Sequence, residues 1–176
     1  MDSIQAAQQD MRAAYFNGVP GIVSSGTVWL AAGLVALWFG PIKGVITLLV
    51  AGTLIFPASV VLCKCLGRSG KHASGNPLAP LAMEGTVWML MCMPVAAAVA
   101  LYHIEWFFPA MLLVIGGRYL TFTTLYGLRV YWLFGGGVGV LALTLAVLQP
   151  PAFVSGLAGG LAEWMFAGIV FAGRSK

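Results

Sequence analysis

Long runs of apolar residues, separated by short polar or proline-containing breaks, dominate the chain. Six of these runs approach the ~20 residues that an α-helix needs to cross about 30 Å of hydrocarbon. They cover about residues 21–39, 44–65, 81–102, 106–128, 130–148 and 153–173. None shows the strict alternation of β-barrel strands. The pattern predicts an all-α integral membrane protein whose six transmembrane helices form a single domain, residues 19–176.

The breaks between the runs have local causes, and one break is weaker than the rest. Gly40-Pro41 and Gln149-Pro150-Pro151 interrupt helices because proline lacks an N–H and clashes with the preceding turn. The apolar run over residues 106–148 is too long for one span, so it must turn. Gly127-Leu128-Arg129 is the best place for that turn. Five helices remain the main alternative to six.

The N-terminal segment, residues 1–18, lacks the continuous apolar core of a signal peptide. Ile4, Ala7, Met11 and Ala14 nevertheless follow helical spacing, and glutamines occupy the other faces. We expect a cytoplasmic amphipathic helix that lies on the membrane surface. A loose terminal tail is the alternative.

Composition narrows the class of protein further. Of the 176 residues, 8% are charged and 60% are hydrophobic, and the mean hydropathy is +0.94. A soluble domain carries about 25% charged residues, and disordered chains are poor in apolar residues. Both classes are excluded, which leaves a multi-pass membrane protein.

The distribution of basic residues predicts an orientation. With the N-terminus inside, seven of the nine Lys and Arg residues fall in cytoplasmic segments: Arg12, Lys64, Arg68, Lys71, Arg129, Arg174 and Lys176. The positive-inside rule then places both termini in the cytoplasm. Lys64, Arg68 and Lys71 are candidates for contact with lipid headgroups. Because the basic residues lie on separate loops, the net charge of +4 does not indicate nucleic-acid binding.

A short repeat suggests internal duplication. The sequence Gly-Thr-Val-Trp occurs at residues 26–29 and again at residues 85–88, near the start of the first and third predicted helices. Many membrane carriers and pores contain internal repeats. We therefore expect three helical hairpins, of which the third lacks the signature.

Two charged residues fall deep inside predicted spans. Placing an ionisable side chain there costs free energy, so such a residue is a candidate functional residue by default. Arg118 lies 11 residues before Arg129, and Glu163 lies 11 residues before Arg174, so both should lie at the same depth. The two side chains could bind each other and lock two helices together, or they could line a pathway for a solute or ion. The third alternative is that they do not meet.

Other polar and small residues lie close to these charges in the sequence. Gly117, Thr121 and Thr124 form a small polar stripe beside Arg118. Glu84, in the first turn of the third predicted helix, could be a gate or a proton site. The helix dipole also favours an acid at this position without any further role. Helix-packing faces are expected where glycines are spaced four apart: Gly135 and Gly139, Gly156 and Gly160.

Signatures of catalysis or of a cofactor are weak. The three cysteines lack metal-ligand spacing, and the two histidines fall on opposite sides of the predicted membrane. No nucleophile–base pair or metal-ligand cluster stands out, so we expect no cofactor or metal site, and an enzyme is the less favoured class.

Four segments resemble an uncharacterised family of small bacterial multi-pass membrane proteins: residues 67–72, 76–78, 84–88 and 105–110. That resemblance implies a location in a bacterial inner membrane, but it implies no activity. In architecture alone, three hairpins in under 200 residues are similar to the bacterial urea channels and the acetate/succinate transporters. Those proteins form ring-shaped oligomers with a pore in each protomer, so the likeness implies a homo-oligomer.

Two functions therefore stay open. The first is a channel or transporter for a small solute or ion, in which Arg118 binds an anion or balances Glu163 while Glu163 or Glu84 takes protons. The second is a structural or accessory membrane protein, whose glycine-rich faces pack against a partner or another copy of the chain.

Overall fold

The computed structural model describes residues 3–173, and every regular element among them is a helix. The main helices are α1 (Ile4–Tyr15), α2 (Val19–Phe39), α3 (Pro41–Gly52), α4 (Ile55–Cys65), α5 (Ala79–Tyr102), α6 (Phe107–Tyr126), α7 (Val130–Leu148) and α8 (Ala152–Ala172). Two short 3-10 helices, η1 (Phe16–Gly18) and η2 (Ile104–Trp106), precede α2 and α6.

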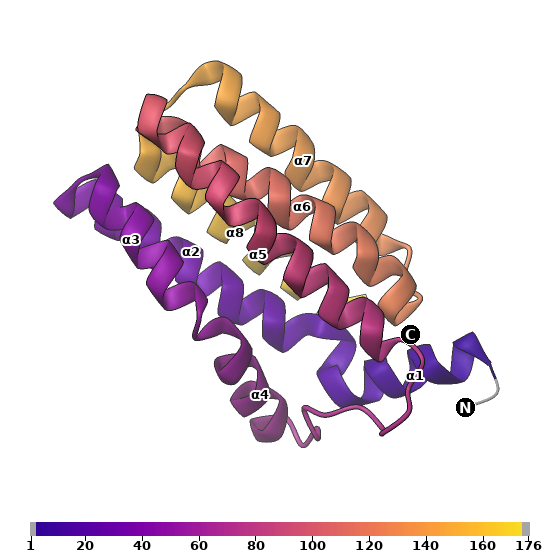
Figure 1. The fold of residues 1–176 in the computed structure, drawn as a ribbon. Helices are drawn as coiled ribbons and strands as arrows, with labels where there is room; N and C mark the ends of the chain where they lie inside the picture. Colours follow the sequence, from indigo (N-terminus) through magenta and orange to yellow (C-terminus); the bar gives the residue numbers. More distant parts are fainter. Residues whose placement is uncertain (1–2, 174–176) are drawn as a thin grey trace.

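The long helices lie side by side and run alternately up and down one bundle (Figure 1). Within residues 3–173, five helical stretches are long and apolar enough to cross a membrane: Ile4–Phe39, Ala79–Tyr102, Ile104–Tyr126, Val130–Leu148 and Ala152–Ala172. The bent pair α3 and α4 makes a sixth if it counts as one span. The predicted all-helical fold is thus confirmed, with five to six apolar spans.

The second predicted span, residues 44–65, is broken in the middle. The axes of α3 and α4 differ by 54°, and the break falls at Thr53 and Leu54. Pro57 explains its position, because a proline ring clashes with the carbonyl four residues earlier, here that of Thr53. Gly52 lowers the helical preference of the same turn.

The N-terminal helix α1 crosses the end of the bundle instead of extending α2 (Figure 1). The turn between them uses left-handed backbone at Phe16, Asn17 and Gly18. Ala7 and Met11 are fully buried, against protein. The apolar face of α1, which we expected to lie on the membrane surface, therefore packs against the helical bundle.

Hydrogen bonds hold α1 in this position. The Arg12 guanidinium donates to the Tyr126 carbonyl at the end of α6, and Gln8 Nε2 donates to the Thr124 carbonyl at 2.8 Å. On its other side, Asp10 accepts from Asn76 Nδ2 at 2.7 Å. The helix thus joins the end of α6 to the loop between α4 and α5.

Helices α2 and α8 form the most extensive interface in the bundle. Glycines on both helices bring their backbones together. A Cβ built on Gly160 would lie 2.8 Å from the Gly26 carbonyl oxygen, and one on Gly33 would lie 2.8 Å from the Leu157 nitrogen. These distances leave no space for a side chain, so the α2–α8 contact depends on glycine.

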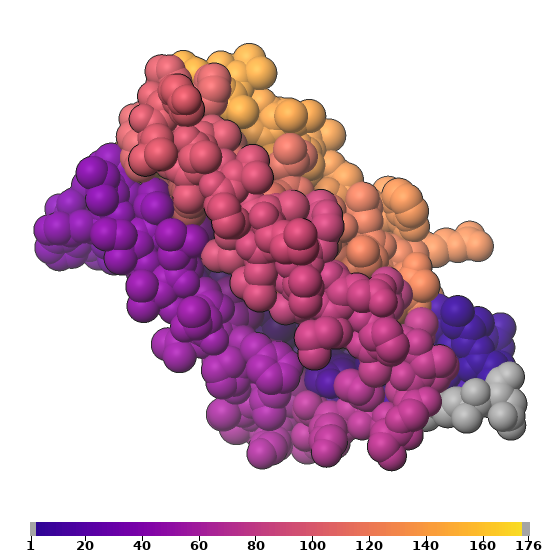
Figure 2. All heavy atoms as spheres, in the orientation of Figure 1, coloured from indigo at the N-terminus to yellow at the C-terminus, as the bar shows by residue number. Residues whose placement is uncertain are grey.

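Helix α5 is peripheral, because it packs mainly on α6 and its buried residue is Ala96. The two copies of the repeated signature consequently differ in environment. Trp29 of α2 is fully buried, whereas Trp88 of α5 is 48% exposed. On the face drawn in Figure 2 the surface is hollowed between α4 and α5.

The third expected hairpin is also not a tightly packed pair. Helices α7 and α8 follow each other in the sequence, yet α7 packs chiefly on α6 and α8 packs chiefly on α2. The two most extensive contacts, α6 with α7 and α2 with α8, each join helices from different expected hairpins. A hairpin repeat in the sequence does not specify such contacts.

Candidate functional site

Glu163 lies at the centre of the bundle, on the side of α8 that faces α2 and α6. Its side chain is 1% exposed. Its Oε1 atom accepts hydrogen bonds from Tyr119 Oη of α6 at 2.6 Å and from Ser25 Oγ of α2 at 3.0 Å. Its Oε2 atom is buried without a hydrogen-bond partner. The carboxyl group therefore joins three helices and keeps one oxygen unused.

Arg118 lies on another side of α6 and points to α5. Its Nη2 donates to Thr86 Oγ1 and its Nη1 contacts Met89 Sδ, each at 3.1 Å. Its guanidinium also lies 5.7 Å from the centre of the Phe122 ring, within range of a cation–π interaction. Its Nε is buried without a partner.

The expected ion pair between Arg118 and Glu163 is therefore wrong: each side chain binds other partners. The reason is helical geometry. Successive residues of an α-helix point about 100° apart, so when Tyr119 faces Glu163, the neighbouring Arg118 must face away. Equal depth in the bundle was a necessary condition for pairing but not a sufficient one.

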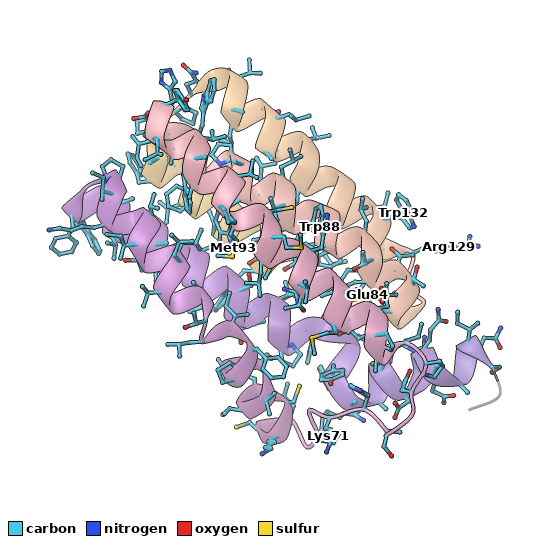
Figure 3. All side chains as sticks on the ribbon, viewed as in Figure 1. Lys71, Glu84, Trp88, Met93, Arg129 and Trp132 are labelled. Atoms are coloured by element: carbon cyan, nitrogen blue, oxygen red, sulfur yellow. The ribbon has the colours of Figure 1, made fainter. Side chains whose placement is uncertain are left out.

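The other pathway candidates are placed less favourably. Thr121 donates to the Arg118 carbonyl of its own helix at 2.7 Å. Glu84 lies exposed on α5 (Figure 3). Neither residue is brought to Glu163.

The basic residues proposed to contact lipid headgroups lie in or beside the loop between α4 and α5. Lys64 and Lys71 are exposed there. Arg68 is half-buried, and its guanidinium lies 5.4 Å from the centre of the Phe16 ring. The ammonium groups of Lys64 and Lys71 are thus open to an anion, whereas the guanidinium of Arg68 packs on η1.

Of the four glycines expected to pack helices, three lie at close helix contacts. Gly156 and Gly160 face α2, and a Cβ on Gly135 would lie 2.8 Å from the Gly116 carbonyl oxygen. A Cβ on Gly139 would meet nothing within 4 Å.

Sequence reasoning missed the hydrogen-bond partners of the two charges. Ser25 carried one available signal, because it occupies the repeat position that matches Glu84. Tyr119 carried another, since it is the polar neighbour of Arg118 at the same depth. Thr86 and Met89 lie on α5, and the sequence alone does not show which face of that helix packs on α6.

Two cavities lie elsewhere. One, of about 280 Å³, is lined by His103, Glu105, Trp106, Gln149 and Pro151. The other, of about 380 Å³, is an apolar groove between α7 and α8. Across residues 3–173, no group of three His, Cys, Asp or Glu side chains could hold a metal ion.

The fold and site define a class: a helical bundle with five to six helices long and apolar enough to cross a membrane, and two charged side chains in its interior. Within that class, the chain belongs to DUF7010, a family of unknown function, which matches residues 4–173. The expected uncharacterised family is confirmed to that extent. No curated protein and no solved structure matches the chain, so the likeness to urea channels and acetate transporters gains no support.

Proposed function

We propose that the protein is a six-span protein of a bacterial inner membrane with both termini in the cytoplasm, and that it moves a small solute or ion. The orientation rests on charge. Helix α1, the end of α4, the loop between α4 and α5 and the turn between α6 and α7 lie at one end of the bundle, and the turn between α2 and α3 lies at the other (Figure 1). The segments at the first end carry five basic residues, Arg12, Lys64, Arg68, Lys71 and Arg129, and Lys43 follows the turn at the second. Arg174 and Lys176, also counted in the sequence argument, lie outside the described residues. The positive-inside rule puts the more basic end in the cytoplasm.

The observation that carries a transport role is that each of the two interior charged side chains has a buried atom without a hydrogen-bond partner. Among the described residues three uncharged side chains share this property, those of Trp106, Thr123 and Ser155. Glu163 Oε2 and Arg118 Nε are both enclosed and both lack a hydrogen-bond partner. An unsatisfied buried polar atom costs about 1–3 kcal/mol, and more when the group is charged. The cost is largest for the two charged groups, and a side chain that exchanges a proton or binds an ion needs a free atom.

In this proposal each charge has a separate task. Glu163 binds and releases a proton, held in place by Tyr119 and Ser25 through its other oxygen. Arg118 binds a small anion, or it balances the charge that Glu163 gains when it loses its proton. The Arg118 guanidinium is held by one hydroxyl and one sulfur, both weaker partners than a carboxylate, so an anion can compete for it.

Flux through proteoliposomes tests the proposal. Vesicles loaded with a pH-sensitive dye and driven by a potassium–valinomycin potential report proton movement, in chloride medium and in gluconate medium. We expect faster acidification than in protein-free vesicles, abolished by Glu163→Gln and reduced by Arg118→Gln. Glu105→Gln is the matched control, because that carboxylate lies at the end of the bundle.

A structural or accessory role makes the opposite prediction. Wild-type vesicles would then match protein-free vesicles in both media, while Glu163→Gln would change only thermal stability. Stable partners found by cross-linking in that case would support the accessory role.

A further inference from the structure

We propose that the groove between α7 and α8 binds one acyl chain of an anionic phospholipid from the cytoplasmic leaflet, with its headgroup at Arg129. The inference rests on the proposed membrane location and orientation, and it is independent of solute transport.

The groove exists because α7 and α8 separate after their connection. Phe134 and Phe166 form its floor, with rings stacked at 3.8 Å and inclined by 3°. Leu133 and Met165 stand on its two rims and are 79% and 67% exposed. Its lining side chains carry no nitrogen or oxygen atom, so the groove favours a hydrocarbon chain over any polar ligand.

The length of the groove selects the occupant. Along α7 it extends from Val130 to Leu141, which is about 16 Å at 1.5 Å per residue. Half of a hydrocarbon core of about 30 Å is about 15 Å. The groove is therefore one leaflet deep, as a single lipid chain is, whereas a helix from a second copy would need a groove across both leaflets.

Charge selects the lipid class. Arg129 directly precedes α7 and is exposed, next to the groove residue Val130. Trp132, 59% exposed, projects outward from the same end of α7 as Arg129 (Figure 3). Arginine binds phosphate groups, and tryptophan is favoured at the headgroup level. A lipid whose chain enters the groove would place its phosphate beside Arg129.

Two adjacent glycines provide a matched pair of variants. A Cβ on either Gly136 or Gly137 meets nothing within 4 Å, but only Gly137 lines the groove. Gly137→Leu should fill the groove, whereas Gly136→Leu should leave it open. Met165→Trp fills the groove from the opposite rim, so the test does not depend on one variant.

The full chain would be extracted in mild detergent, delipidated, and titrated with phosphatidylglycerol or phosphatidylcholine under native mass spectrometry. We expect one phosphatidylglycerol per wild-type chain, with binding weakened about tenfold or more by Gly137→Leu and by Met165→Trp but unchanged by Gly136→Leu. Arg129→Gln should remove the preference for phosphatidylglycerol over phosphatidylcholine.

The inference is overturned if Gly137→Leu binds phosphatidylglycerol as the wild type does, or if a second copy of the chain displaces the lipid. Carbonate washing of cell membranes separates this failure from that of the membrane location. A chain released by carbonate refutes the location, whereas a retained chain without a groove lipid refutes only the lipid site.

Discussion

Gly160→Ala is the sharpest test of the α2–α8 interface. An alanine Cβ at this position would lie 2.6 Å from Leu30 Cγ and 2.8 Å from both the Gly26 carbonyl oxygen and the Leu30 nitrogen. Ordinary contact begins at 3.4 Å, so two backbone atoms of α2 would have to move by about 0.6 Å. Backbone atoms cannot rotate away as a side chain can, so the helices must separate.

The magnitude follows from two opposing effects. Overpacking typically costs about 1–3 kcal/mol. Replacing glycine by alanine within a helix returns up to about 1 kcal/mol of helix propensity. Gly168 on the same helix isolates the second effect, because a Cβ there meets nothing within 4 Å. We therefore expect Gly160→Ala to be less stable than Gly168→Ala by about 1–3 kcal/mol.

Reversible unfolding in mixed micelles, titrated with SDS and followed by tryptophan fluorescence, measures this difference directly. Loss of stability only in Gly160→Ala would agree with a contact between the two backbones. Equal stability of the two variants would refute the reasoning, because the α2–α8 interface would then tolerate a methyl group where the structure has no space for one.

Three further predictions concern other parts of the bundle. Tyr119→Phe removes the 2.6 Å hydrogen bond to Glu163. The free energy of unfolding should fall by about 0.6–1.7 kcal/mol, the range for hydrogen bonds between membrane helices. An unchanged free energy of unfolding in the same SDS titration would argue against the bond. Arg12→Gln removes a charged donor from the end of α6, so amide exchange in α1, read by mass spectrometry, should accelerate about tenfold. A membrane-impermeant maleimide should label Cys65, which is exposed, and should not label Cys63, which is 2% exposed. Labelling of Cys65 should occur in inverted membrane vesicles and not in right-side-out vesicles, where it would contradict the proposed orientation.

The ends of the long helices could be predicted from the sequence because they depend on local residues. Gly40 ends α2 with a positive φ of 94°, and Pro151 precedes α8. The break between α3 and α4 was not predicted. Gly52 and Pro57 lie beside it, but proline alone is an ambiguous signal. Pro94 lies inside α5 without interrupting it, and no glycine stands five residues before it.

Helix rotation and neighbours could not be predicted. Depth along a helix follows from counting residues, and Tyr119, the neighbour of Arg118, does bind Glu163. The direction of each side chain depends on which helices pack together, and that depends on close contacts such as Gly160 with Gly26. Those contacts join residues more than 130 positions apart, and no local pattern specifies them.

The position of Glu163 limits how any ion could reach it. On one side, α2 and α8 are held together by glycine contacts that leave no space between their backbones. Access must therefore come from the side of α6, where Tyr119 covers the carboxyl group. Because Arg118 is the next residue of the same helix, a rotation of α6 that withdraws Tyr119 from Glu163 also withdraws Arg118 from Thr86 and Met89. Under the proposed function, one movement of α6 would change both charged sites, and it would have to carry or break the contact with α7, the helix that packs most extensively on α6.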